Sequence, residues 1–373
     1  MRKIRVLVID DSALVRSLLT EIINREDDLA CVGTAGDPLI ARGMIRELNP
    51  DVITLDVEMP RMDGLDFLAR LMRLRPTPVV MISALTDHGA EVTLKALELG
   101  AVEFVAKPRA DVLGGLDILA SQIAEKIRIA ASAHITRRLS SPLSPNPVPK
   151  VATILPPTRG ALKFGPEVLV FIGASTGGTE AIKAILERIP VEFPGIAITQ
   201  HMPAGFTASF AARLNNACKI TVKEAADGER ILPGHAYLAP GGRQFSVRRL
   251  DRGYAAVVRE GDLVNRHRPS VEVLFQSAAL EAGKSAYGIM LSGMGADGAR
   301  AMRAMRDAGS YNFVQDENSC VVFGMPREAI KCGAANEVLP LGEIADALIA
   351  RVMQDHERKL KAQSKAQPSN PLN

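Results

Sequence analysis

The sequence predicts two α/β domains, each built on a doubly wound parallel sheet. Two observations point to this fold class. Short runs of β-branched residues alternate with longer segments of helical period over residues 4–131, and the same alternation resumes from 164 to 353. At 373 residues the chain also exceeds the length of one ordinary hydrophobic core. We therefore expect two domains of ordinary size.

The first domain shows five repeats of a strand followed by a helix. Each apolar run is short and ends near a polar or glycine-containing segment, as strands do, whereas the following segments are long enough for helices. The expected strands are Ile4–Ile9, Ala30–Thr34, Val52–Leu55, Val79–Ile82 and Val102–Val105. The expected helices are Ala13–Asn24, Pro38–Leu48, Gly64–Leu74, His88–Leu99 and Asp111–Ile129.

A proline-rich segment separates the two domains. Six prolines lie between Ser140 and Pro157, and they remove backbone donors and favour extended linker geometry. We place the first domain at residues 1–130, the linker at 131–164 and the second domain at 165–353. The polar residues 354–373 are expected to form a disordered tail.

Composition excludes several classes of function. Hydrophobic residues make up 47% and charged residues 23% of the chain, which are ordinary globular values. The net charge is only +3 and there is no Trp, so nucleic acid is not expected as a partner. No apolar run approaches the roughly 18 residues that span a bilayer, and the first apolar run stops at Asp10, too early for a signal peptide. The four cysteines form no CxxC pair and have no metal-ligand spacing with His, so we expect them to be buried or incidental thiols in a reducing compartment. We therefore expect a cytoplasmic protein without membrane insertion.

Acidic side chains follow the strands of the first domain. Asp10 and Asp11 come after the first strand and Asp56 after the third, so the parallel-sheet rule brings them together. Such carboxylates need a compensating cation, and Mg²⁺ prefers oxygen ligands. Ser83 and Lys107 follow the fourth and fifth strands and could contact a phosphoryl group on Asp56. The alternative is that each Asp only caps the next helix.

The first domain resembles the receiver domain of two-component response regulators over about residues 1–125. The motifs that carry this resemblance are VLVIDDSALVR, DVITLDVEMPRMDGLDFL, VVMISA and VEFVAKP. The resemblance implies a flavodoxin-like fold, phosphotransfer from a histidine kinase to Asp56, and Mg²⁺ held by Asp10, Asp11 and Asp56. It also implies that Ser83, Phe104 and Lys107 are switch residues.

Three reactive side chains follow strands of the second domain. Ser175 comes after Val168–Ile172, His201 after Ile196–Thr199, and Asp297 after Tyr287–Leu291. If these strands are parallel, the three side chains meet at one edge of the sheet and form a serine-hydrolase triad. Taken singly, a His is more often an ordinary polar residue and an Asp before a helix is more often an N-cap.

Ser175 lies in a glycine-rich turn between a strand and a helix. The segment GASTG matches the GxSxG pattern, but the chain order Ser, His, Asp differs from that of α/β-hydrolases. The turn by itself could equally bind a phosphate or dinucleotide. In the hydrolase reading, the backbone amides near Thr176 and Met294 are candidate oxyanion donors.

The second domain resembles the chemotaxis protein-glutamate methylesterases of the CheB family over most of residues 165–350. The motifs that carry this resemblance are FIGASTGGTEAI, ITQHMPAGFTASFAARL, AYLAPGG, HRPSVEVLF, GIMLSGMGADGA and QDENSCVVFGMPREAI. The resemblance implies hydrolysis of glutamate methyl esters on methyl-accepting chemotaxis receptors, release of methanol, and deamidation of receptor glutamines. It implies a chemotaxis histidine kinase as phosphodonor and inhibition by the unphosphorylated receiver.

Two alternative functions stay open at this point. The triad could serve a hydrolase or amidase with another acyl substrate, or the second domain could be a non-catalytic output module. Arg266, His267 and Arg268 form a short basic run that is more often a solvated surface than a binding site.

Overall fold

The structure is a computed structural model that describes residues 2–57, 59, 63–83, 87–106, 116–134 and 164–366. The chain separates into two compact units, Met1–Ala161 and Leu162–Asn373. The predicted linker, apart from 131–134 and Phe164, and the switch residue Lys107 lie outside the described residues.

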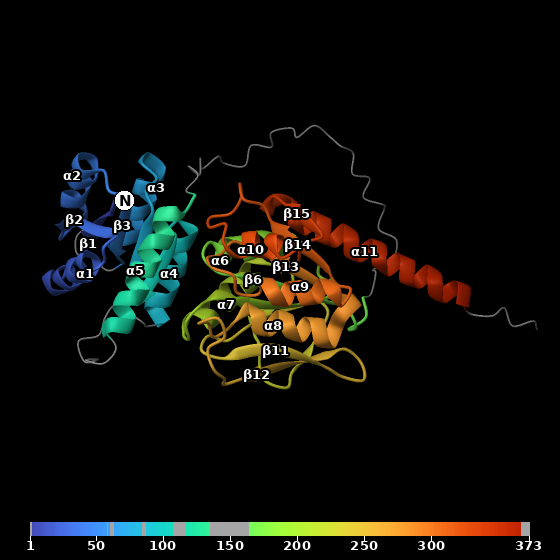
Figure 1. The fold of residues 1–373 in the computed structure, drawn as a ribbon. Helices are drawn as coiled ribbons and strands as arrows, with labels where there is room; N and C mark the ends of the chain where they lie inside the picture. The colour runs from blue at the N-terminus through green and yellow to red at the C-terminus, as the bar shows by residue number, and fades with distance from the viewer. Residues whose placement is uncertain are drawn as a thin grey trace, which may run out of the picture. The chain divides into compact units, whose positions relative to one another are not determined.

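The first unit contains the five predicted strands in one parallel sheet with the order β2-β1-β3-β4-β5. This is the flavodoxin-like order, with its topological switch point between β1 and β3. Figure 1 labels β1, β2 and β3 of this sheet. Helices α1 and α5 contact each other, as do α3 and α4. The elements are β1 (Ile4–Ile9), α1 (Ala13–Arg25), β2 (Leu29–Ala35), α2 (Pro38–Leu48), β3 (Val52–Asp56), α3 (Gly64–Leu74), β4 (Val79–Ser83), α4 (Asp87–Glu98), β5 (Glu103–Ala106) and α5 (Leu116–Ser132).

The central strands of this unit are buried on both faces. Val6 to Ile9 in β1 and Val52 to Leu55 in β3 are at most 1% exposed, which explains their almost continuous apolar sequence. The helices that follow have their own caps: Ser12, Asp37 and Asp63 accept hydrogen bonds from the first amides of α1, α2 and α3. Capping therefore does not account for the acidic residues at the ends of β1 and β3.

The second unit contains a seven-stranded parallel sheet with the order β15-β14-β13-β6-β7-β10-β8. Helix α6 contacts α7 and α11, whereas α9 contacts α8 and α10, so two groups of helices accompany the sheet (Figure 1). The strands are β6 (Leu169–Ala174), β7 (Gly195–Gln200), β8 (Thr221–Glu224), β10 (His235–Leu238), β13 (Ala286–Met290), β14 (Tyr311–Gln315) and β15 (Glu337–Leu339). The helices are α6 (Gly178–Leu186), α7 (Phe206–Ala217), α8 (Val271–Ser277), α9 (Ala299–Asp307), α10 (Met325–Lys331) and α11 (Leu341–Ala366), with a π turn η1 (Ala278–Ala282) and a 3₁₀ turn η2 (Gly283–Ser285) after α8.

We expected the βα alternation to continue through the whole second domain. A second, antiparallel sheet interrupts it. It consists of β9 (Arg230–Ile231), β11 (Gln244–Arg249) and β12 (Tyr254–Arg259) in the order β11-β12-β9. Phe245 and Val247 of β11 are buried on the face that packs against α8, whereas Ser246 between them is only partly buried. A tight turn joins β11 to β12 and ends at Gly253, whose φ of +77° suits glycine.

The predicted disordered tail is corrected in part. Helix α11 continues to Ala366 instead of ending near Met353. Ile344, Leu348 and Val352 are buried at helical spacing and anchor its first half. The polar residues that follow include neither Gly nor Pro before Pro368, so the helix can extend from this anchored half without burying more surface.

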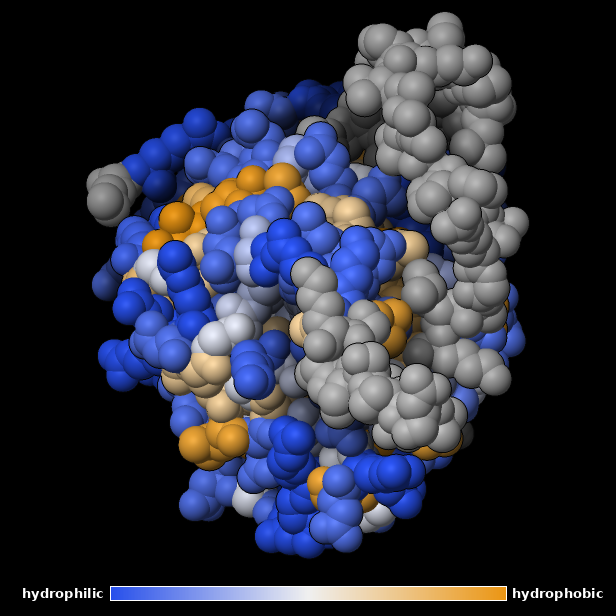
Figure 2. Space-filling model, turned by 90° about the vertical axis from the view of Figure 1, so that its right-hand side faces the viewer, coloured by the Kyte–Doolittle hydropathy of each residue, from blue (hydrophilic) through white to orange (hydrophobic). Residues whose placement is uncertain are grey.

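The surface is mostly hydrophilic on the face drawn in Figure 2, with hydrophobic residues in separate patches. Some exposed apolar surface is normal for a folded protein. Within the described ranges, no helix combines the length and apolar character needed to cross a bilayer.

Candidate active site

Adjacent parallel strands bring the three predicted residues of the second unit to one edge of the sheet. Strands β13, β6 and β7 are neighbours, and their carboxyl ends precede Asp297, Ser175 and His201. The backbone amide of His201 donates to the carbonyl oxygen of Ala174 at 3.1 Å. Ser175 and His201 therefore lie next to each other just beyond the strands.

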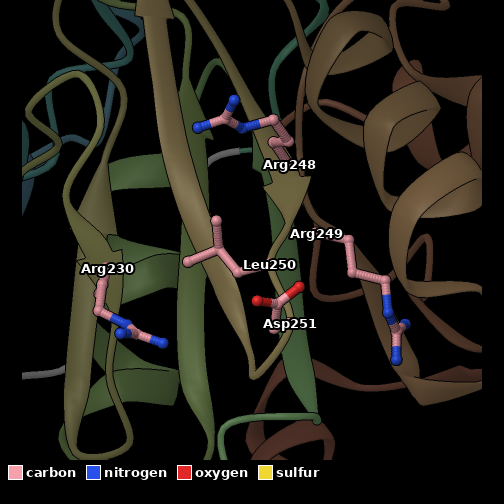
Figure 3. Close-up of a pocket in the computed structure, with 5 residues that line it drawn as sticks. All are labelled: Arg230, Arg248, Arg249, Leu250 and Asp251. Atoms are coloured by element: carbon pink, nitrogen blue, oxygen red, sulfur yellow. The ribbon is translucent and has the colours of Figure 1, made fainter.

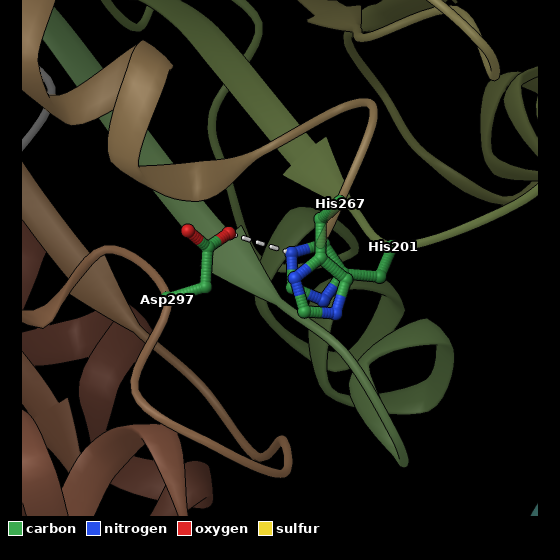
Figure 4. A group of neighbouring side chains, drawn as sticks. All are labelled: His201, His267 and Asp297. Carbon is green, nitrogen blue, oxygen red and sulfur yellow. Dashed lines mark hydrogen bonds and ion pairs between the residues drawn. The ribbon is translucent and has the colours of Figure 1, made fainter. Parts of the chain in front are cut away.

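His201 and Asp297 form a direct pair (Figure 4). The Nε2 atom of His201 lies 2.8 Å from Oδ2 of Asp297. The ionised carboxylate can only accept, so Nε2 carries the proton and Nδ1 is the basic nitrogen. Nδ1 is buried and has no hydrogen-bond partner among the described residues. The ring thus offers a proton acceptor on the side that does not face Asp297.

The environment of Asp297 keeps its carboxylate charged. Burial by itself would raise the pKa, but hydrogen bonds from His201, Asn265 and Ser270 outweigh it and lower the pKa to about 2. Asn265 Nδ2 and Ser270 Oγ each donate to Oδ1 at 2.8 Å. The carboxylate can therefore stabilise positive charge on the imidazole.

Asp297 also lies at the start of a helix, although not of the helix that follows it in sequence. The first residue of α8, Val271, donates its amide to Oδ2 at 2.7 Å, and the Glu272 amide donates to Oδ1 at 3.3 Å. In contrast, α9 begins after Gly298 without a side-chain cap. The N-cap alternative is thus partly right, because Asp297 binds the amides of α8 while it also binds His201.

The backbone around Ser175 is held by neighbouring strands. The Ser175 amide donates to the carbonyl of Ser292 at 3.0 Å. Gln200 Nε2 donates to the carbonyl oxygens of Ser175 at 2.9 Å and His201 at 3.2 Å. A Cβ atom added to Gly293 would lie 2.7 Å from the Cβ of Ser175, so only glycine allows this approach.

The turn after Ser175 depends on glycine. Gly177 has a φ of +75°, and a Cβ at this position would lie 2.6 Å from Val321. Gly178 then begins α6, and its amide donates back to the Ser175 carbonyl at 2.7 Å. The structure therefore places Ser175 at a sharp strand-to-helix turn, next to the positive end of the helix macrodipole.

The two candidate oxyanion donors are the amides of Thr176 and Met294, which follow Ser175 and Gly293 in the chain. Thr176 is buried, and its carbonyl accepts from Ser292 Oγ at 2.8 Å. Met294 follows Gly293, which touches Ser175, and within the described part of the chain no acceptor is assigned to the Met294 amide. Both amides therefore belong to residues that directly follow Ser175 or a glycine packed against it.

Four contributors to this site were not selected from the sequence. They are Gln200, Asn265, His267 and Ser270, which contact the triad residues or their backbone. The interpretation of His267 as part of a solvated basic run is wrong, because its ring stacks on His201 with centroids 3.7 Å apart. Gln200 precedes His201 directly, and that adjacency was the only sequence signal for it.

The acidic residues of the first unit meet as the strand order requires. Each of Asp10, Asp11 and Asp56 offers a carboxylate oxygen, and these atoms lie within 4.8 Å of one another. Asp10 and Asp56 are buried and Asp11 is exposed. Arg16 donates to the carbonyl oxygens of Asp10 at 2.7 Å and Asp11 at 2.9 Å, which fixes the loop after β1.

The structure describes two of the three predicted switch residues, Ser83 and Phe104. Phe104 is half-buried in β5, whereas only the backbone of Ser83, the last residue of β4, is described. Ser83 pairs with Ala106 in the sheet, so β4 and β5 end side by side.

A surface hollow of about 400 Å³ lies elsewhere in the second unit (Figure 3). Arg230, Arg248, Arg249, Leu250 and Asp251 line it, at the turn between β11 and β12. Nη2 of Arg249 donates to Oε2 of Glu167 at 3.4 Å, and Glu167 lies just before β6. The hollow is therefore near the amino ends of the parallel strands, away from Ser175.

Comparison with known proteins finds a family for each of the two units. The family model described as CheB methylesterase matches residues 170–348, and the model described as response regulator receiver domain matches residues 6–113. The chain is 66% identical over 359 residues to the protein-glutamate methylesterase/protein-glutamine glutaminase 1 of Albidiferax ferrireducens, covering 96% of each chain. It is 56% identical over 353 residues to the protein-glutamate methylesterase/protein-glutamine glutaminase of Nitrosomonas europaea, covering 95% of this chain and 98% of that relative.

Among solved structures, the CheB methylesterase catalytic domain of Thermotoga maritima is 36% identical, covering 49% of this chain and 97% of that chain with a TM-score of 0.48. The alignments to the two sequence relatives span both units of this chain. They also cover nearly the full length of each relative. The chain therefore belongs to the CheB methylesterase family, with a response regulator receiver domain ahead of the methylesterase domain.

Proposed function

We propose that this protein is a phosphorylation-activated serine hydrolase that removes methyl groups from glutamate methyl esters of methyl-accepting chemotaxis receptors and also deamidates receptor glutamines. The observation that carries the proposal is the 2.8 Å contact between His201 and Asp297 beside the strand end that holds Ser175. The names of the relatives, which refer to both activities, support the choice of substrate.

In the proposed reaction, Ser175 Oγ attacks the carbonyl carbon of the ester while Nδ1 of His201 takes the hydroxyl proton. Asp297 stabilises the imidazolium that forms, since its pKa of about 2 keeps it ionised. His201 then returns the proton to the leaving methoxide, and methanol departs. The glutamyl ester on Ser175 remains.

Water completes the cycle by the reverse use of the same groups. His201 takes a proton from water, the resulting hydroxide attacks the acyl carbon, and the proton returns to Ser175 as the free carboxylate leaves. With a glutamine substrate the first leaving group is ammonia, so one triad serves both reactions. The amides of Thr176 and Met294 would stabilise the oxyanion, at about 3 kcal/mol for each donor.

The receiver would supply control. Asp10, Asp11 and Asp56 fit a divalent cation that prefers oxygen ligands, because three carboxylate oxygens lie within 4.8 Å of one another. Bound Mg²⁺ would neutralise charge on an incoming phosphoryl group. Asp56 would accept that group from a chemotaxis histidine kinase, and Ser83, Phe104 and Lys107 would respond to it.

We place this reaction in the cytoplasm, because all four cysteines of the chain are free thiols.

Replacement of Ser175 tests the proposal directly. In Ser175→Ala, release of methanol from methyl-labelled receptor should fall to the background rate, because no hydroxyl remains to form the acyl-enzyme. Asp56 should still accept phosphate from a small phosphodonor, which controls for folding of the receiver. A matched assay on small acyl esters separates a receptor esterase from a general one. Methanol release by Ser175→Ala at the wild-type rate would remove Ser175 from the mechanism.

A further inference from the structure

We propose that His267 is a positioning residue whose imidazole fixes the tilt of the His201 ring, as part of a turn that also holds Asp297. The inference rests on the proposed function, because it takes His201 to be the general base. His267 would touch neither the ester nor the proton that is transferred.

The two imidazole rings lie face to face (Figure 4). Their centroids are 3.7 Å apart and their planes differ by 8°. The single hydrogen bond from Nε2 sets the distance between His201 and Asp297, but one bond at a ring edge leaves the ring free to tilt about that bond. Contact with a flat partner removes this freedom, because only a parallel ring keeps full contact. The stack therefore controls the direction in which Nδ1 points.

The position of His267 is fixed by a tight turn over residues 264–267. Val264 and His267 exchange two backbone hydrogen bonds, of 3.1 and 2.9 Å. The central residues Asn265 and Arg266 have φ values of 50° and 69°, the pattern of a type I′ turn. Gln244 Nε2 also donates to the His267 carbonyl at 3.1 Å.

This turn contacts both members of the pair. Asn265 Nδ2 donates to Oδ1 of Asp297 at 2.8 Å, while His267 covers one face of His201. Positive φ values are uncommon for residues such as Arg266, and such strain is concentrated at functional sites. A single loop therefore aligns the carboxylate and the imidazole relative to each other.

The composition of this group would also suit a metal ion, since ligand atoms of His201, His267 and Asp297 lie within 4.8 Å of one another. A metal binds an imidazole in the plane of the ring, along the nitrogen lone pair. Two rings that lie nearly parallel and face to face direct their lone pairs along parallel planes, which do not converge on one point. The geometry favours stacking over metal binding.

Three variants of the full-length protein test the role of the ring. His267→Ala should lower kcat for methanol release by about tenfold with KM within about twofold, because orientation affects the chemical step and not receptor binding. His267→Phe should retain kcat within about threefold, because a flat ring remains. His235→Ala is the matched control: this histidine begins β10, at the amino ends of the parallel strands and not at their carboxyl ends, and its replacement should leave kcat unchanged.

Urea unfolding of each variant separates a loss of orientation from a loss of fold. The proposal is overturned if His267→Ala keeps kcat within twofold of wild type, if His267→Phe is as slow as His267→Ala, or if KM changes in place of kcat. Failure of the proposed function has a different signature, since wild type and Ser175→Ala would then release methanol equally, whatever the His267 variants do.

Discussion

The carboxylate of Asp297 is charged although its side chain is 1% exposed, because five donors converge on it. In Asp297→Asn, the amide group would donate toward His201 and shift the ring proton to Nδ1, which could then no longer accept from Ser175. We expect kcat for methanol release to fall by about 10³- to 10⁴-fold, as for the equivalent change in other triads. An Asn variant with kcat within tenfold of wild type would contradict this role.

The same substitution predicts a dependence of stability on pH. The pKa of Asp297 is lowered from 3.8 to about 2 in the folded protein, so its charge stabilises the fold above about pH 4. This contribution, about 2 kcal/mol, is lost as the pH falls from about 4 to 2. Urea unfolding should show that the difference in free energy of unfolding between wild type and Asp297→Asn narrows over this interval. A constant difference would mean that ionisation of Asp297 does not stabilise the fold.

Helix α11 divides into a packed half and an exposed half. Leu348 is fully buried, whereas the described side chains from Glu357 to Ala362 are exposed. The rings of His356 and Phe164 are in contact, with their centroids 4.9 Å apart. Truncation after His356 keeps this contact and should change the free energy of unfolding by less than about 1 kcal/mol. Leu348→Ala should cost about 2–5 kcal/mol, because it leaves a cavity. Urea unfolding compares the two; equal losses would mean that the second half also packs.

Coupling between the two units is tested by phosphorylation of the full-length chain. A small phosphodonor should raise methanol release by wild type by roughly 5- to 150-fold, the range of a coupling free energy of 1–3 kcal/mol. Asp56→Asn should keep the basal rate and lose the response, because it cannot form the acyl phosphate. Serial samples assayed for methanol and for bound phosphate give both readouts. A response that survives in Asp56→Asn would place the control elsewhere.

The parallel sheets and the position of the chemistry could be predicted from the sequence because they depend on local signals. Apolar runs such as Val6–Ile9 identify strands by themselves, and the parallel-sheet rule then brings Ser175, His201 and Asp297 to one edge. The antiparallel sheet was missed because β11 and β12, at six residues each, are as long as β6 and β7. A strand pattern by itself does not show which other strand it pairs with.

Only the folded structure shows which residues contact and orient the triad. His267 and Asn265 reach His201 and Asp297 from a turn with left-handed backbone, and Ser270 reaches Asp297 from the start of α8. Such contacts join residues far apart in the chain and have no periodicity, so the sequence does not record them. By itself the sequence determined which side chains stand at the strand ends; only the folded loops determined how those side chains are oriented, because orientation depends on packing between distant segments.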